Sequence, residues 1–158
     1  MKTTCISPAK GARALRKGRF SGQYQIYHIT TRTRDREPFF LELTLGRAVV
    51  RSLKREDDAG HTKTLAFVVM PDHLHWLFQL AGTRSLSVSV NTIKSFASRT
   101  INQIIGRSGP VWQKGFHDHA LRDEEDLAAI ARYIVANPLR AGLARKVADY
   151  PLWDAVWI

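Results

Sequence analysis

Cysteine, acidic side chains and long apolar runs are all scarce in this sequence, and each scarcity excludes a class of protein. Cys5 is the only cysteine among 158 residues, so no internal disulfide can form, which fits a reducing cytoplasm. No run approaches the roughly 18 apolar residues of a membrane span, and no apolar segment follows the basic N-terminus to make a signal peptide. We therefore expect a cytoplasmic protein with no membrane partner.

The shortage of acidic residues leaves a strongly basic chain. Against 24 Lys and Arg residues there are 14 Asp and Glu residues, which gives a formal net charge of +10. A basic surface gains binding free energy by releasing the counterions condensed on phosphates, so nucleic acid is the partner that this charge favours. An anionic membrane surface is the weaker alternative.

The length predicts one domain over residues 1–158. The composition of its two ends predicts a basic arm and an apolar tail. Residues 1–19 contain basic but no acidic side chains, which is typical of a DNA-contacting arm and equally of a solubilising tail. Residues 144–158 end in Pro, Leu, Trp, Val and Ile side chains, which we expect to dock on the body because an exposed patch of this kind would be sticky.

Alternating and helical hydrophobic patterns divide the remainder into strands and helices. One start is ambiguous, because residues 85–90 alternate like a strand although a long helical pattern follows; we favour a helix there. Asp123 is the expected N-cap of the last helix, and Pro138 should end or bend it. The expected elements are a strand at 23–33, a helix at 41–57, a hairpin of strands at 65–70 and 73–80, a helix closed by Gly106, an irregular strand at 111–121, and a helix from Asp123 to Pro138.

This order predicts an α+β fold. Strand, helix, strand, strand, helix, strand is the split βαβ arrangement of a ferredoxin-like sandwich with an antiparallel sheet. The last helix is additional to that βαββαβ unit, and it carries Tyr133.

Two histidines lie at the start of the second hairpin strand. Pro71 and Asp72 suit the central positions of a tight turn, so His73 and His75 occupy the first residues of the strand and share one face of the sheet. Two imidazoles on one face can share a metal ion, although spacing alone favours a pair that fills space and forms hydrogen bonds. His117 and His119 repeat the spacing and form a rival pair, for which a structural or DNA-contacting role is favoured because their strand alternates less clearly.

Tyr133 and Asn137 lie four residues apart on the last expected helix and should project from one face. They could simply be a tyrosine at a helix margin and an Asn-Pro helix end. Together with His73 and His75 on a basic protein, however, they would suffice for phosphodiester transfer. A divalent cation, Mn²⁺ or Mg²⁺, held by the two histidines and Asn137 could polarise a phosphate that Tyr133 attacks.

At this point the sequence resembles the REP-associated tyrosine transposases, a branch of the single-tyrosine HUH endonuclease and transposase superfamily. The resemblance runs from about residue 16 to residue 145. It is carried by Arg16-Lys17-Gly18-Arg19, Tyr27-His28-Ile29-Thr30, Met70-Pro71-Asp72-His73-Leu74-His75, Trp112-Gln113 with Asp118-His119, and Tyr133-Ile134 through Asn137-Pro138-Leu139-Arg140-Ala141-Gly142-Leu143.

The resemblance implies that His73, His75 and Asn137 hold a divalent metal ion and that Tyr133 is the nucleophile. Such enzymes nick single-stranded DNA beside a palindromic hairpin and leave a 5′-phosphotyrosine. We expect a monomer, whereas exchange of the last helix would require a dimer. The candidates for DNA contact, chosen because basic side chains can follow phosphates, are Arg16, Lys17, Arg19, Arg32, Arg34 and Lys94.

Two rival functions and one departure stay open. A ferredoxin-like module could bind hairpin DNA or RNA without cutting it, and a metal-dependent hydrolase could use water in place of Tyr133. The C-terminal Pro151-Leu152-Trp153-Asp154 does not match the Pro-Trp-Ser-Ser ending of many members. Because a tail segment touches the active site in some relatives, autoinhibition by Trp153 and Trp157 is a hypothesis here.

Overall fold

An antiparallel sheet organises the part of the chain that this computed structural model describes, residues 24–123 and 125–156. Within it, the strands lie in the order β4-β1-β3-β2-β5, and every adjacent pair is antiparallel. The elements are β1 (Ile26–Arg32), α2 (Leu43–Asp58), β2 (Thr62–Met70), β3 (His73–Leu80), α3 (Leu86–Ile105), β4 (His117–Ala120), α4 (Leu127–Val135), α5 (Asn137–Arg140) and β5 (Trp153–Ala155), with 3-10 turns at Arg34–Arg36, Phe39–Leu41 and Val147–Asp149.

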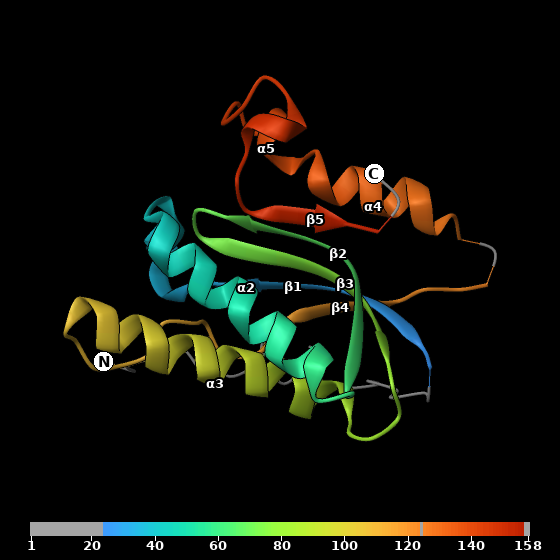
Figure 1. Cartoon of the computed structure of the whole chain (residues 1–158), viewed down its shortest axis with the longest axis horizontal. Helices are drawn as coiled ribbons and strands as arrows, with labels where there is room; N and C mark the ends of the chain where they lie inside the picture. The colour runs from blue at the N-terminus through green and yellow to red at the C-terminus, as the bar shows by residue number, and fades with distance from the viewer. Residues whose placement is uncertain (1–23, 124, 157–158) are drawn as a thin grey trace, which may run out of the picture.

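The helices cover both faces of this sheet. Helices α2 and α3 lie together on one face, and α4 lies on the other (Figure 1). Strand β3 sits between β1 and β2, with β4 beyond β1, so the predicted ferredoxin-like α+β fold is confirmed. No helix in the described residues is long and apolar enough to cross a bilayer.

Strand alternation assigns each side chain to one of two cores. In β1, Tyr27 and Ile29 are buried among residues of α2 and α3, whereas His28 and Thr30 point to the α4 face. Strand β2 is buried on both faces because it is central: Phe67 and Val69 face α2, and the intervening residues contact α4. The predicted apolar central strand is therefore confirmed, and it begins earlier than expected.

The ambiguous stretch at 85–90 is helical. The Ser85 side chain accepts a hydrogen bond from the Val88 amide and caps α3, whose residues Leu86 and Val90 are buried four residues apart. Gly106 ends α3 in the left-handed conformation, with a φ of 66°. The preference for a helix and its predicted end are both confirmed.

The irregular strand expected at 111–121 is mostly not a strand. Only His117–Ala120 forms β4, while Trp112 makes an isolated bridge to Thr33. Val111 and Trp112 are buried against α3 instead, and Gly115 has a φ of 76° that turns the chain between the two paired segments. The apolar residues of this stretch pack as a loop, which alternation cannot distinguish from a strand.

The last helix begins later and ends earlier than predicted. Asp126, not Asp123, caps α4 by accepting a hydrogen bond from the Ala129 amide. The helix stops at Val135, and a separate short helix, α5, begins at Asn137. Because the ring of Pro138 cannot follow a continuous helix, Tyr133 and Asn137 lie on successive helices and not on one face of a single helix.

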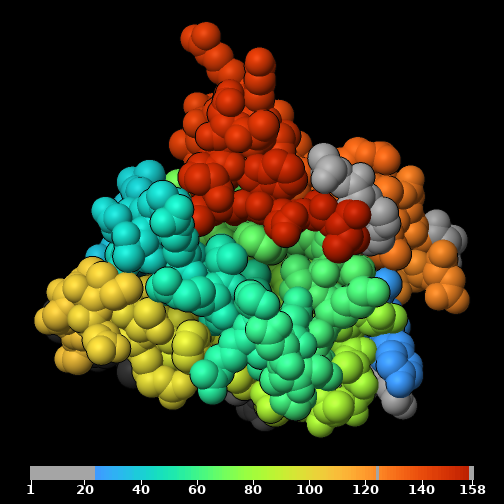
Figure 2. Space-filling view, in the orientation of Figure 1, coloured from blue at the N-terminus to red at the C-terminus, as the bar shows by residue number. Residues whose placement is uncertain are grey.

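The apolar tail docks on the body, as expected, and it adds a strand that the sequence did not predict. Strand β5 pairs with β2, the Leu152 side chain is only 4% exposed, and the Tyr150 hydroxyl donates to the Val69 carbonyl at 2.7 Å. Figure 2 shows α5 and the segment after it standing above the α2 and α3 layer. Trp153 is half-buried in the α4-side core, Trp157 lies outside the described residues, and autoinhibition stays a hypothesis.

Candidate active site

The two histidines of the hairpin lie on the α4 face of the sheet. In register, His75 is opposite Val68 of β2 and His73 is opposite Met70, and both of these partners belong to the α4-side core. Opposed residues of antiparallel strands point to the same face. The imidazole centroids of His73 and His75 are 5.0 Å apart, so the predicted sharing of one face is present in the structure.

Contacts from β1 hold the ring of His75. Its Nδ1 atom is 3.0 Å from Thr30 Oγ1 and 3.2 Å from His28 Nε2. We assign the Nδ1 proton as donated to Thr30, which leaves the Nε2 lone pair free. Burial lowers the pKa of His75 to about 3, and the same direction is favoured by the charges of His28, His73, Arg140 and Arg32. The imidazole is therefore neutral at neutral pH, the form in which histidine binds metal ions.

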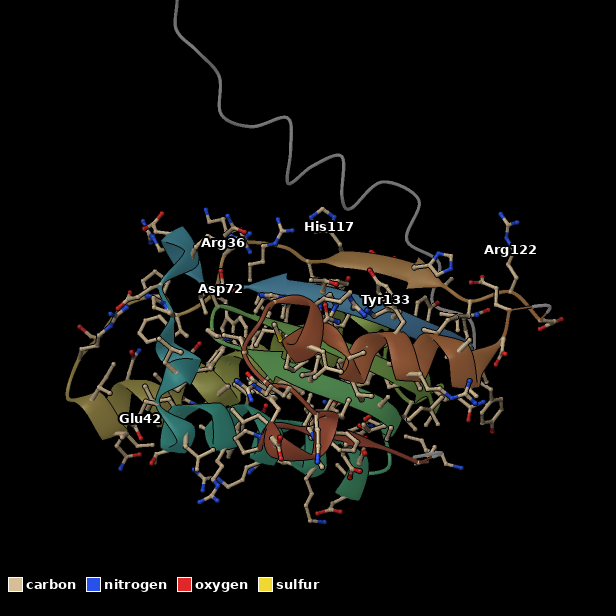
Figure 3. All side chains as sticks on the ribbon, turned by 90° about the horizontal axis from the view of Figure 1, so that it is seen from above. Arg36, Glu42, Asp72, His117, Arg122 and Tyr133 are labelled. Carbon is tan, nitrogen blue, oxygen red and sulfur yellow. The ribbon has the colours of Figure 1, made fainter. Side chains whose placement is uncertain are left out.

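A carboxylate holds the other ring. His73 Nδ1 is 2.6 Å from Asp72 Oδ1, so the carboxylate accepts the Nδ1 proton and leaves Nε2 available. Arg36 lies 3.4 Å from the second carboxylate oxygen of Asp72, and Figure 3 shows both residues at the turn end of the sheet. A histidine that donates one ring proton to a carboxylate is the usual arrangement for a metal ligand.

Tyr133 projects from α4 over the sheet in Figure 3, and its side chain is 59% exposed. The guanidinium carbon of Arg140 lies 3.9 Å from the centroid of the Tyr133 ring, and Arg140 also donates to the Tyr133 carbonyl at 2.8 Å. The charge of Arg140 is among those that lower the pKa of His75. The arginine that stacks on Tyr133 is therefore within electrostatic range of His75.

The side-chain amide of Asn137 has a fixed orientation. Its Nδ2 atom donates to the Ile134 carbonyl at 2.8 Å, which orients the half-buried amide and identifies Oδ1 as its acceptor. No group of three or more His, Cys, Asp or Glu side chains suited to a metal ion occurs among residues 24–123 and 125–156. A metal site here would therefore consist of two imidazole nitrogens and an amide oxygen, a donor set that suits Mn²⁺ and tolerates Mg²⁺.

The rival histidine pair is on the edge strand β4. His119 Nε2 lies 3.0 Å from both carboxylate oxygens of Glu125, and His119 is opposite His28 in the sheet. Burial, with the charge of His119, lowers the pKa of His28 to about 4. His117 is exposed and is the first residue of β4 (Figure 3). His119 is thus engaged by a carboxylate and lies opposite His28, which in turn contacts His75.

A protein-family model matches most of this chain. The model of the family described as "Transposase IS200 like" matches residues 22–137, a span that contains the hairpin, Tyr133 and Asn137. The chain belongs to the IS200-like transposase family.

Individual relatives agree with this membership. A REP-associated tyrosine transposase of Escherichia coli strain K12 is 31% identical over 87 residues, 54% of this chain and 50% of that protein. A protein of Haemophilus influenzae is 30% identical over 99 residues, 56% of each chain. This IS200-like transposase chain thus spans about half the length of these relatives.

A solved structure shares the fold. The structure of a REP-associated tyrosine transposase bound to a REP hairpin is matched over 85% of this chain and 79% of its own, with a TM-score of 0.67 and 24% sequence identity. This likeness supports the α+β architecture that the strand order gives.

The candidate DNA contacts of this IS200-like transposase fall into three groups. Arg32 and Arg34 are exposed at the end of β1, where Arg32 is opposite His73. Lys94 on α3 is not a surface cation: it is 8% exposed and donates to the carbonyls of Gln113 and Gly115. These two hydrogen bonds engage its ammonium within the fold, and a role in DNA contact stays a prediction. Arg16, Lys17 and Arg19 lie outside the described residues.

The sequence did not single out the residues that support the IS200-like site. Alternation placed His28 and Thr30 on one face of the first strand, but only the register of β1 against β3 puts them beside His75. Asp72 was predicted only as a turn residue, although its position before His73 could have suggested a ring partner. Arg140 gave no signal, because its stacking on Tyr133 depends on the break between α4 and α5.

Proposed function

We propose that this IS200-like transposase chain cuts and rejoins single-stranded DNA beside a palindromic hairpin, with Tyr133 as the nucleophile. The observation that carries the proposal is the Tyr133 and Arg140 pair near the sheet face of His73 and His75. An exposed phenol over a sheet face that carries potential metal ligands is an arrangement that suits a tyrosine nucleophile. A site assembled from Tyr133 and the histidines of one chain would permit a monomer.

In the cleavage step the Tyr133 Oη atom attacks the scissile phosphorus. A phosphorus–oxygen bond to tyrosine forms while the bond to the 3′ oxygen breaks, which gives a 5′-phosphotyrosine and a free 3′-OH. A second 3′-OH can attack the same phosphorus to rejoin the strand and release Tyr133. The stacked guanidinium of Arg140 holds the ring in place for attack and puts a positive charge near the phosphate.

The residues that would hold a divalent metal ion are His73 and His75 through Nε2 and Asn137 through Oδ1. When bound, Mn²⁺ or Mg²⁺ would polarise the scissile phosphate and offset the charge that develops on it. The chain itself fixes the donor atoms: Asp72 holds the ring of His73, Thr30 holds that of His75, and the Ile134 carbonyl holds the amide of Asn137.

A hairpin substrate is supported by family membership, by the REP hairpin bound to the related transposase of known structure, and by the net charge of +10. Arg32 and Arg34 at the end of β1, with Arg16, Lys17 and Arg19 of the arm, would contact phosphates next to the site. Such contacts position the DNA without reading its sequence.

The deciding experiment uses labelled single-stranded hairpin oligonucleotides with Mn²⁺, analysed on denaturing gels. We expect a covalent protein–DNA adduct with the wild type and none with Tyr133→Phe. Tyr24→Phe is the matched control, because Tyr24 is also exposed, at 62%, and should keep the adduct. Cleavage without an adduct in all three proteins would indicate a water nucleophile, and binding of a cognate hairpin without cleavage would indicate a binding module.

A further inference from the structure

A shallow groove of about 660 Å³ runs between α3 and the segment that leads into β4. It lies outside the histidine and tyrosine site. Its lining includes three cationic side chains and no carboxylate. Arg99 and Lys114 are exposed within it, and its other polar side chains are short or neutral. The polar lining side chains above the buried Lys94 are Asn91, Ser95, Ser98, Arg99, Gln113 and Lys114.

The wall of this groove is fixed by hydrogen bonds. The Lys94 ammonium donates to the carbonyls of Gln113 and Gly115, both at 2.8 Å. The Trp112 indole N–H donates to the Lys94 carbonyl at 3.1 Å. The loop is therefore tied to α3 before any ligand arrives, so a ligand would not have to order it.

The groove adjoins the candidate active site at one end of the sheet. The Gln113 amide donates to the Arg32 carbonyl at 2.9 Å, and Arg32 is opposite His73. Trp112 is bridged to Thr33. The histidines lie on the α4 face and the groove lies beside α3, so a DNA strand would reach the groove by passing Arg32 around the end of β1.

We propose that this groove binds the sugar–phosphate backbone of the single-stranded DNA that flanks the cleavage site. This inference rests on the proposed function. Cations, serine hydroxyls and amides are the groups that bind phosphate oxygens. The ring of Trp112 is buried and leaves no aromatic surface for base stacking. The groove therefore binds phosphates, and its affinity does not depend on the DNA sequence. One helix and one loop bound the groove.

The test compares two variants that each lose two positive charges. Arg99→Gln with Lys114→Gln alters the groove, whereas Arg47→Gln with Arg51→Gln alters two exposed positions on α2 that do not line it. Binding is measured against salt concentration for hairpins with and without a single-stranded flank, with Ca²⁺ in place of Mn²⁺. For the flanked hairpin we expect the groove variant to bind about three- to tenfold more weakly and its salt slope to fall by about 1.4, or about 0.7 per phosphate contact on a single strand.

The control variant should keep the wild-type slope, and the bare hairpin should bind all three proteins equally. An unchanged slope in the groove variant, or an equal loss in the control, would overturn the proposal. An equal loss on the bare hairpin would assign the groove to the duplex and also overturn it. Adduct formation by Tyr133 at saturating DNA is a separate readout, so failure of the groove is distinguishable from failure of the proposed function.

Discussion

Each imidazole of the candidate site has one nitrogen engaged and one free. Thr30 and Asp72 determine which nitrogen that is, through contacts of 3.0 Å and 2.6 Å to the two Nδ1 atoms. Spacing in the sequence found the two histidines because alternation within a strand is local. It could not find Thr30, because cross-strand neighbours depend on which strands pair and in which register.

Removing the Thr30 hydroxyl should weaken metal binding. Thr30→Val keeps the shape of the side chain but removes the closer of the two polar contacts of His75 Nδ1, leaving only His28 Nε2 at 3.2 Å. We therefore expect Mn²⁺ affinity measured by calorimetry to fall about tenfold. Thr100→Val is the control, because its hydroxyl donates to the Phe96 carbonyl on α3. Equal affinities of the wild type and Thr30→Val would contradict the assigned role.

Metal-free protein should lose stability as the pH falls from 6.5 towards 4. Burial lowers the pKa of His28 from 6.5 to about 4 in the folded state, so below pH 6.5 the unfolded chain takes up a proton that the folded chain does not. The free energy of unfolding therefore falls on acidification, by about 4 kcal/mol at pH 5 for His28 and His75 together. Urea denaturation with a chelator present measures this difference.

Replacing one of these histidines should flatten the pH dependence. His28→Gln has no ring to protonate, so its unfolding free energy should change less between pH 7 and pH 5 than that of the wild type. His117→Gln, which alters an exposed histidine, should retain the wild-type dependence. The same dependence in His28→Gln and the wild type would show that other groups cause it.

Among the elements, the break between α4 and α5 has the largest effect on the site. It brings Arg140 back over Tyr133, where a continuous helix would have carried the arginine onward. Pro138 predicted an end or a bend, and that prediction was correct. The stacking of Arg140 on Tyr133 could not be predicted from the sequence, because it depends on the direction that the chain takes after Ala136.

Arg140 should therefore affect catalysis more than binding. Arg140→Gln removes the stacked guanidinium, so we expect the rate of adduct formation at saturating hairpin to fall about tenfold or more, with Mn²⁺ affinity unchanged. Arg140→Lys keeps the charge but not the planar stack, and it should recover only part of the rate. Full activity of Arg140→Gln would exclude this role.

Hairpin β2–β3 and the two long helices were predictable because their patterns are local. The apolar run of β2, the Pro71-Asp72 turn and the stripe of α3 each identify an element within a few residues. Strand β5 was missed because three residues carry no alternation of their own, and only the open edge of β2 makes them a strand. Its pairing is a property of the whole molecule.

At the scale of the whole molecule, the C-terminal tail should be essential for stability. Leu152 fills the space over Gly46, where a Cβ atom would overlap the leucine side chain, so Leu152→Ala should lower the free energy of unfolding by about 2–5 kcal/mol. Val156→Ala, at a position that is 60% exposed, should change it by less than about 0.5 kcal/mol. Chemical denaturation measures both, and equal stability of the two variants would contradict the role of Leu152.

The late position of β5 also has a consequence for biosynthesis. Strand β2 emerges from the ribosome long before β5, and until then Leu65-Ala66-Phe67-Val68-Val69-Met70 forms an apolar sheet edge with unpaired backbone groups. A nascent chain that stalls between the two strands would therefore expose its most aggregation-prone segment. Truncated translation products should for this reason be strong substrates for chaperones, whereas the finished chain covers this edge with its own β5.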